Sequence, residues 1–112
     1  MAQVFQNFKK NILTDFLMLG IAEEHAVTFA AGLAASGYKP VVSIYSSFLP
    51  GELMIRYYMM CVFKILPVVM IVDRAGLVGQ DGETHQGIFD VSFMSAIPNL
   101  TIIAPKDTKG IN

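Results

Sequence analysis

Residues 21–45 read IAEEHAVTFAAGLAASGYKPVVSIY, a stretch that places a helix directly before a strand. Its first part is rich in alanine and glutamate, which favour helices, and its apolar residues recur every three or four positions. Gly37 is placed to end this helix, because glycine is common just after the last helical residue. The β-branched run after Pro40 favours a strand. We therefore expect a helix over residues 21–36 and a strand over Val41–Tyr45.

Two further segments of the chain favour strands. Residues 68–72 are a continuous apolar run between Pro67 and Asp73, a pattern typical of a strand buried on both faces of a parallel sheet. Residues 101–104, which lie between two prolines, are the second candidate. Helices that alternate with such strands predict an α/β fold, in which a parallel sheet is flanked by helices.

The length and composition exclude several classes of protein. With 112 residues, the chain has room for one small domain. A hydrophobic content of 54% excludes a disordered tail. The net charge of −1 provides no basic surface for nucleic acid, which is therefore not expected as a partner. The single cysteine, Cys61, cannot form an internal disulfide.

Residues 57–72 raise the question of a membrane segment, because they are sixteen residues with a single charge, Lys64. A spanning helix needs about 20 apolar residues, and Pro67 also interrupts the run. We therefore expect no membrane segment. The N-terminal residues contain no compact apolar core of the kind that a signal peptide has, so the expected location is the cytoplasm. An alternative is a non-catalytic interaction module that exposes residues 57–72 to a partner or a membrane.

A polar loop follows the expected strand 68–72. It spans residues 74–87, RAGLVGQDGETHQG, and ligand sites of parallel sheets commonly lie in loops at the carboxyl ends of the strands. Arg74 could hold a phosphate, Asp81 could accept a hydrogen bond from a hydroxyl, and His85 could donate or relay a proton. The alternative is an ordinary solvated loop. Two histidines and one cysteine do not suffice for a zinc site, so no metal ligand is expected.

Three polar residues open the first expected helix, namely Glu23, Glu24 and His25. Because neighbouring helical positions point about 100° apart, the two carboxylates are not expected to share one face. A carboxylate in the first turn can simply offset the helix dipole. The functional alternative is an acid–base group that faces a ligand nitrogen. After the strand, Phe48 could either stack on a flat ring or pack into the core.

Two blocks of the sequence closely resemble the 1-deoxy-D-xylulose-5-phosphate synthase family, which comprises thiamine-diphosphate enzymes of the transketolase type. The blocks are residues 20–49 and 66–107. Within the second block, the pattern DRAGLVGxDGxTHxGxFD sets many residue types at defined spacing, which makes it far more specific than a short motif. The resemblance implies that residues 1–112 are part of a pyrimidine-binding domain of the transketolase type. It also implies a homodimer.

The resemblance implies a transferase that condenses pyruvate with glyceraldehyde 3-phosphate. The product is 1-deoxy-D-xylulose 5-phosphate, a precursor in isoprenoid and thiamine biosynthesis, and CO₂ is lost. Thiamine diphosphate is the implied cofactor and serves as the electron sink. Mg²⁺ accompanies it, with its ligands expected in an N-terminal domain outside these residues.

The resemblance also assigns roles to individual residues. Glu23 would hydrogen-bond N1′ of the aminopyrimidine and act in acid–base catalysis, with His25 near the cofactor and Phe48 stacked on the pyrimidine. Four residues would line the substrate pocket, where one would contact the phosphate and one would also be catalytic. They are Tyr45, Arg74 (the phosphate contact), Asp81 and His85 (the catalytic residue).

Residues 11–19 and 50–65 depart from the family's pattern. Both can be related to it by a shift of reading frame, so we interpret them as compensating frame errors in the gene or in its sequencing. Residues 50–65 replace an amphipathic helix with an apolar stretch, which predicts poor packing there. We expect the chain alone to be inactive, because a cofactor clamped between two domains is not held well by part of one. An alternative is a split enzyme, in which a second chain supplies the diphosphate-binding half.

Overall fold

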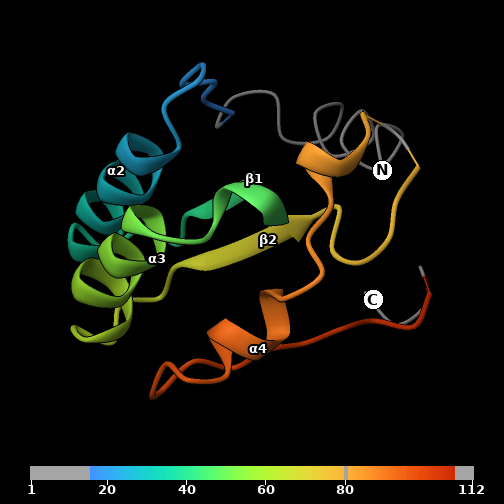
Figure 1. Cartoon of the computed structure of the whole chain (residues 1–112). Helices are drawn as coiled ribbons and strands as arrows, with labels where there is room; N and C mark the ends of the chain where they lie inside the picture. The colour runs from blue at the N-terminus through green and yellow to red at the C-terminus, as the bar shows by residue number, and fades with distance from the viewer. Residues whose placement is uncertain (1–15, 80, 108–112) are drawn as a thin grey trace.

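The computed structural model describes residues 16–79 and 81–107. In this part of the chain, two parallel strands carry helices on one side and a long loop at one end (Figure 1). The helices and strands are α2 (Glu23–Ala35), β1 (Val41–Tyr45), α3 (Glu52–Tyr57), β2 (Val69–Asp73) and α4 (Asp90–Met94). A π-helical turn extends α3 over Tyr58–Val62, and 3₁₀ turns occupy Ser46–Phe48 and Glu83–His85.

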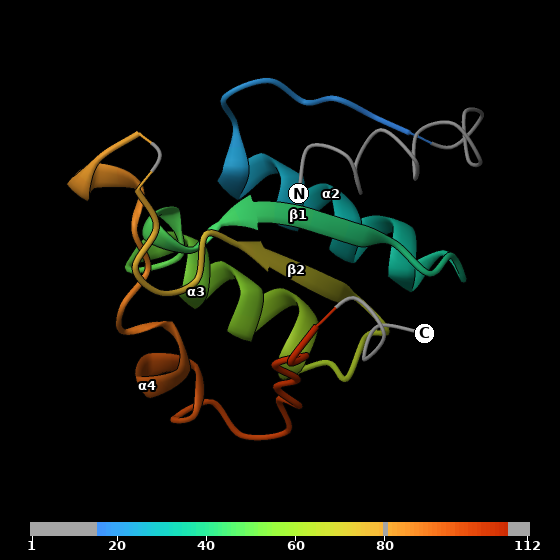
Figure 2. The ribbon, with the colours of Figure 1, turned by 90° about the vertical axis from the view of Figure 1, so that its right-hand side faces the viewer.

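The two strands pair in parallel, from Val41 opposite Val69 to Tyr45 opposite Asp73. Figure 2 shows both arrows pointing the same way. A parallel pair requires a crossover connection, which α3 provides. Both strands therefore end at the same edge of the sheet, where the loop 74–87 begins. The α/β fold with a parallel sheet, predicted from the sequence, is confirmed.

The end of α2 is the one that the sequence predicts. Gly37 has a φ of +94°, which glycine adopts without strain. Its N–H donates to the carbonyl of Ala34 at 3.0 Å, and the N–H of Tyr38 donates to the carbonyl of Leu33 at 3.1 Å. These two bonds are the Schellman pair that closes a helix. At its other end, α2 begins at Glu23 rather than at residue 21, so a glutamate occupies its first helical position.

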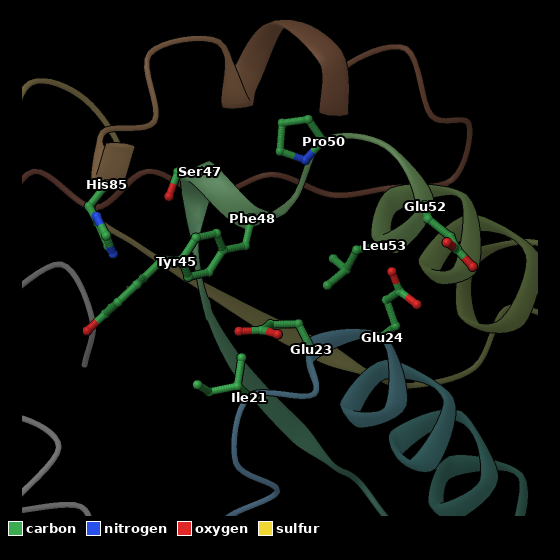
Figure 3. Close-up of a pocket in the computed structure, with 10 residues that line it drawn as sticks. All are labelled: Ile21, Glu23, Glu24, Tyr45, Ser47, Phe48, Pro50, Glu52, Leu53 and His85. Atoms are coloured by element: carbon green, nitrogen blue, oxygen red, sulfur yellow. The ribbon is translucent and has the colours of Figure 1, made fainter. Parts of the chain in front are cut away.

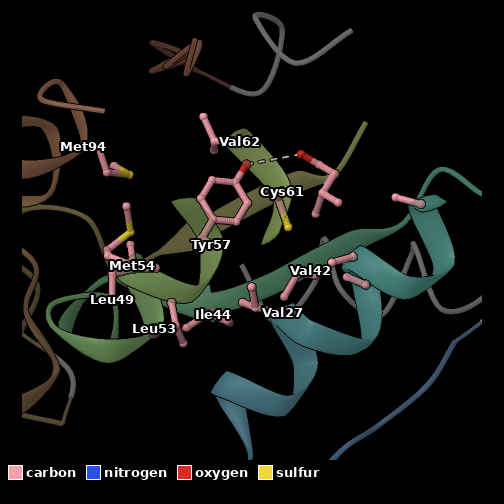
Figure 4. Packing of buried hydrophobic residues seen from close by; sticks show 14 residues of the cluster. Val27, Val42, Ile44, Leu49, Leu53, Met54, Tyr57, Cys61, Val62 and Met94 are labelled. Carbon is pink, nitrogen blue, oxygen red and sulfur yellow. Dashed lines mark hydrogen bonds between the residues drawn. The ribbon is translucent and has the colours of Figure 1, made fainter. Parts of the chain in front are cut away.

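The core lies between the sheet and the helices α2 and α3 (Figure 4). Small side chains of α2, among them Ala30 and Ala31, are buried in it. Residues 50–65 contribute Leu53, Met54, Tyr57, Cys61 and Val62. The prediction that residues 50–65 pack poorly is therefore wrong. Apolar side chains recur in this stretch at helical spacing, which is enough to build one buried face.

One face of the sheet is open, so the prediction of a strand buried on both faces is wrong. The side chains of Val69 and Ile71 on β2 are 57% and 40% exposed. Those of Val42 and Ile44 on β1 are buried, because they face the core that α2 and α3 complete. The strand also spans residues 69–73 rather than 68–72.

Residues 101–104 form no strand, contrary to the prediction. They are exposed, and in the described part of the chain the sheet consists of β1 and β2. A strand needs a neighbour that pairs with its backbone N–H and C=O groups. A β-branched composition favours the extended conformation, but it cannot supply that neighbour.

The apolar stretch 57–72 is divided between the core and the surface. Cys61 and Val62 are buried, whereas Met59 and Phe63 are exposed. The stretch contains the end of α3, a turn and most of β2, so it is not one continuous helix. Within residues 16–79 and 81–107, no helix has the length and apolar character needed to cross a membrane.

Stability is expected to fall above pH 9 because of Cys61. Burial raises the pKa of this thiol from 9.0 to about 11. Below pH 9 the thiol is protonated in the folded and unfolded states alike. Between pH 9 and 11 the unfolded chain ionises first, which should lower the free energy of unfolding by about 2–3 kcal/mol.

Urea unfolding across this pH range measures the effect. Cys61→Ala should flatten the profile up to about pH 10, where Tyr57, whose pKa burial also raises, ionises in the unfolded chain. A loss of stability between pH 9 and 11 that is the same with and without Cys61 would contradict the prediction.

Candidate active site

A cavity of about 650 Å³ opens where the N-terminus of α2, the end of β1 and the start of α3 meet (Figure 3). Its place follows from the topology, because ligand sites of parallel sheets lie beyond the carboxyl ends of the strands. It is lined by Ile21, Glu23, Glu24, Tyr45, Ser47, Phe48, Pro50, Glu52, Leu53 and His85. Of the residues predicted for the site, Glu23, Tyr45, Phe48 and His85 are in this lining.

Both carboxylates at the start of α2 line the cavity. The helix directs its end, rather than its flank, at the cavity. Side chains that diverge by about 100° can then still border the same space. In Figure 3, Glu23 extends toward Phe48, whereas Glu24 extends toward Leu53.

Arg56 of α3 offsets two of the three carboxylates at the cavity. Its Nη2 donates to Glu52 at 2.5 Å, and its Nε lies 3.5 Å from a carboxylate oxygen of Glu24. The hydrogen bond to Glu52 is the main reason that the pKa of Arg56 is raised. Among the ion pairs of the described residues, Glu23 has no such partner. It is therefore the carboxylate most available to a ligand.

Three rings form another wall of the cavity. The ring centroids of Tyr45 and Phe48 are 5.8 Å apart, and that of His85 lies 6.0 Å from Tyr45 and 5.6 Å from Phe48. Phe48 is 40% exposed, whereas the next residue, Leu49, is fully buried. Leu49 thus takes the core position and leaves the ring of Phe48 at the cavity. A flat apolar face near a carboxylate suits a planar nitrogen heterocycle.

Arg74 lies next to Tyr45 and pairs with Asp81, and neither residue is in the lining of the cavity. The guanidinium carbon of Arg74 is 4.3 Å from the centre of the Tyr45 ring, and Nη2 donates to the tyrosine hydroxyl at 3.4 Å. Nη1 is paired with Oδ2 of Asp81, and this hydrogen bond is the main reason that the pKa of Arg74 is raised. The loop 74–87 thus places Arg74 and His85 against one tyrosine, with Asp81 paired to Arg74.

His25 lies apart from these residues. Its side chain is exposed and packs on Phe29, one turn along α2, with the ring centroids 6.1 Å apart. It does not line the cavity, because it follows Glu23 and Glu24 around the helix to the solvent side. Its predicted place near the cofactor therefore gains no support from its position.

Sequence reasoning missed three residues at the contact between the end of β1, the loop 74–87 and the start of α4: Ser46, Gly87 and Asp90. The hydroxyl of Ser46 donates to Oδ2 of Asp90 at 3.1 Å, and both side chains are buried. Gly87 lies directly against Ser46. The available signal was a glycine and an aspartate at defined spacing after His85, because both stand in the motif THxGxFD.

The cavity offers acid–base and stacking groups. A carboxylate beside an aromatic wall can exchange a proton with a ring nitrogen, and the imidazole of His85 can donate or relay one. Across the part of the chain that the structure describes, no group of three or more His, Cys, Asp or Glu side chains is placed to hold a metal ion.

Comparisons with known proteins agree with this architecture. Residues 2–111 match the family model described as the transketolase pyrimidine-binding domain. The 1-deoxy-D-xylulose-5-phosphate synthase of Clostridium acetobutylicum is 54% identical over 105 residues, which are 94% of this chain and 17% of that protein. The synthase of Lachnoclostridium phytofermentans is 61% identical over 93 residues, which are 83% of this chain and 15% of that protein. The synthase of Haemophilus ducreyi is 55% identical over an alignment of 104 positions, which covers 89% of this chain and 16% of that protein.

The chain spans only 15–17% of the length of these three relatives. The match to the domain model, by contrast, covers nearly all of the 112 residues. It agrees with the parallel pairing of β1 and β2 and with the helices that pack on them. The chain therefore belongs to the transketolase pyrimidine-binding domain family.

Proposed function

We propose that this chain is the pyrimidine-binding part of a 1-deoxy-D-xylulose-5-phosphate synthase. The proposed reaction is the thiamine-diphosphate-dependent condensation of pyruvate with glyceraldehyde 3-phosphate, with loss of CO₂. The observation that carries the proposal is the cavity in which the carboxylate of Glu23 meets the rings of Tyr45, Phe48 and His85. The names of the relatives point to the same reaction.

The residues at the cavity fit the aminopyrimidine part of the cofactor. Phe48 offers a partly exposed ring on which a planar heterocycle can stack. Glu23 offers a carboxylate, without an ion-pair partner in the described residues, to a ring nitrogen. When bound, thiamine diphosphate supplies the electron sink that lets a 2-oxo acid lose CO₂. Glu23 is proposed to exchange a proton with the ring nitrogen and to hold the ring in one orientation.

The residues around Tyr45 are proposed to handle the substrates. Arg74 is held over the tyrosine ring and paired with Asp81. A guanidinium has five N–H donors, so it retains donors for the phosphate of glyceraldehyde 3-phosphate. His85 lines the cavity and is proposed to donate or relay a proton to the reacting oxygen.

The rest of the enzyme is proposed to lie outside this chain. The family resemblance supports a diphosphate site with Mg²⁺ in another domain, a homodimer and a cytoplasmic location. The matched region is 17% of the Clostridium acetobutylicum synthase. A cofactor that is clamped between domains is held poorly by part of one. We therefore propose that the isolated chain is inactive.

We also propose that residues 11–19 and 50–65 carry compensating frame errors. Residues 11–15 lie outside the described part of the chain. The support for the proposal is that the family's usual residues emerge when either segment is read in a shifted frame. Resequencing the locus tests it. An intact gene that encodes residues 50–65 in frame in several related isolates would rule out a sequencing error.

A chimera tests the proposed function. Residues 20–107 of this chain replace the matched segment of the Clostridium acetobutylicum synthase, and CO₂ release is measured with pyruvate and glyceraldehyde 3-phosphate. We expect release by the chimera and none by the isolated chain. A second chimera, which keeps the parent's residues in place of 50–65, should be more active if that segment is frame-shifted. Two folded chimeras that both fail to release CO₂ would overturn the proposed reaction.

Phe48→Ala should raise the concentration of thiamine diphosphate needed for half-maximal activity of the chimera by about 2- to 12-fold, because aromatic pairing contributes about 0.5–1.5 kcal/mol. Phe29→Ala is the matched control, since Phe29 is 38% exposed and Phe48 is 40% exposed, but Phe29 lies on the outer side of α2. Titration of the cofactor measures both effects. Equal weakening by the two substitutions would show that stacking on Phe48 is not involved.

A further inference from the structure

Ser46 and Asp90 are the buried polar side chains of the described residues, with exposed fractions of 1% and 7%. The hydroxyl of Ser46 donates to Oδ2 of Asp90 at 3.1 Å, and the N–H of Val91 donates to Oδ1 at 2.8 Å. Burying a carboxylate is costly unless its oxygens are hydrogen-bonded. Both oxygens of Asp90 have a donor, so the contact is well satisfied and joins the end of β1 to the start of α4.

Gly87 completes this contact. A Cβ atom at Gly87 would lie 1.7 Å from the hydroxyl oxygen of Ser46 and 3.3 Å from its Cα, so glycine is required at this approach. The N–H of Gly87 donates to the carbonyl of Arg74 at 3.0 Å, and the N–H of Gly76 donates to the carbonyl of Gly87 at 2.5 Å. The two ends of the loop 74–87 are therefore tied to each other and rest on Ser46. We call Ser46, Gly87 and Asp90 the clasp.

The clasp lies between two sets of cavity residues: Tyr45 and Phe48 at the end of β1, and His85 in the loop 74–87. Ser46 directly follows Tyr45 and is part of the 3₁₀ turn that carries Phe48. Gly87 comes two positions after His85. The clasp is therefore close in sequence to all three rings, and the centroid of the imidazole lies 6.0 Å from that of Tyr45 and 5.6 Å from that of Phe48.

We propose that Ser46 and Asp90 are positioning residues, which hold the loop 74–87 against the end of β1 so that His85 faces the cavity. They touch no reacting group themselves; they act through the loop. The inference rests on the proposed function only for what the cavity binds. The geometry of the clasp is a property of the chain without any ligand.

The test is Ser46→Ala in the 112-residue chain, with Ser43→Ala, on the exposed side of the preceding strand β1, as the matched control. Amide hydrogen exchange at Gly76 and Gly87 should become about 2- to 12-fold faster in Ser46→Ala, as expected for the loss of one hydrogen bond. The nuclear Overhauser contact between the rings of His85 and Phe48 should weaken. Neither should change in Ser43→Ala.

Asp90→Asn is the second variant, because it removes the charge and keeps an acceptor oxygen. It should perturb the loop less than Ser46→Ala does. Ala30 and Ala31 are buried residues of α2. Exchange at their amides distinguishes a local release of the loop 74–87 from a destabilisation of the whole fold. Unchanged exchange and ring contact in Ser46→Ala would overturn the proposal, and so would equal acceleration in α2.

The exchange measurements need no substrate, so they are independent of the proposed reaction. If the loop is released in Ser46→Ala while the chimera fails to release CO₂, the proposed function fails and the clasp stands. If the chimera is active and Ser46→Ala leaves the loop unchanged, the clasp fails and the proposed function stands.

Discussion

Glu23→Gln in the chimeric synthase is expected to lower the rate of CO₂ release by about 10²- to 10⁴-fold, the range in which a positioned general acid–base group contributes. Glutamine keeps the size of the side chain but cannot exchange a proton. Glu23 is the carboxylate of the cavity that Arg56 does not engage, and it extends toward Phe48 (Figure 3). Initial rates at saturating substrates and cofactor measure the loss, and Glu23→Ala should be at least as severe.

Glu24→Gln is the control for this prediction. Glu24 lines the same cavity on the next helical position, but its carboxylate faces Arg56 at 3.5 Å. Its replacement removes a partly exposed ion pair, which contributes little, so the rate should change by less than about threefold. Circular dichroism checks that both variants fold. Near-wild-type turnover of Glu23→Gln, or an equal loss in both variants, would contradict the assignment.

Leu53→Ala is expected to lower the free energy of unfolding by about 2–5 kcal/mol, the range for removal of a buried leucine side chain. Leu53 is 3% exposed and packs in the core that α2, β1 and α3 share. The neighbouring Tyr57 also ties α3 to the start of β2, because its hydroxyl donates to the carbonyl of Val68 at 3.3 Å (Figure 4). Urea unfolding followed by circular dichroism measures the change.

Ile55→Ala provides the comparison within the same helix. Ile55 is 63% exposed, so its truncation should change the free energy of unfolding by no more than about 0.5 kcal/mol. Similar small effects of both substitutions would mean that α3 is not part of the core. That result would revive the expectation that residues 50–65 pack poorly.

Much of the local structure could be predicted from the sequence. Helix and strand propensities, together with residues a few positions apart, predict the helix α2, the glycine at its end and the strand β1. The prediction for residues 50–65 was wrong because the spacing of apolar residues, rather than their number, decides whether a helix has one face to bury. Leu53, Tyr57 and Cys61 recur every four residues, which is the repeat of a helix face.

The candidate site could be predicted from the sequence only in part. Glu23, Phe48 and His85 carry recognisable chemistry, and the carboxyl ends of parallel strands are a known place for ligands. That both Glu23 and Glu24 border the cavity depends on the direction in which the end of α2 points. A periodicity argument cannot supply that direction.

The amino-acid order alone determined helix α2, strand β1 and the residue types that could do chemistry, because these follow from short-range propensity and side-chain identity. Contacts between distant segments settled the rest. They left one face of the sheet open, gave residues 101–104 no strand to pair with, and turned His25 away from the cavity. They also brought Ser46 onto Asp90, 44 positions later. The energy of such contacts depends on the packing of the whole chain, so no local pattern in the sequence encodes it.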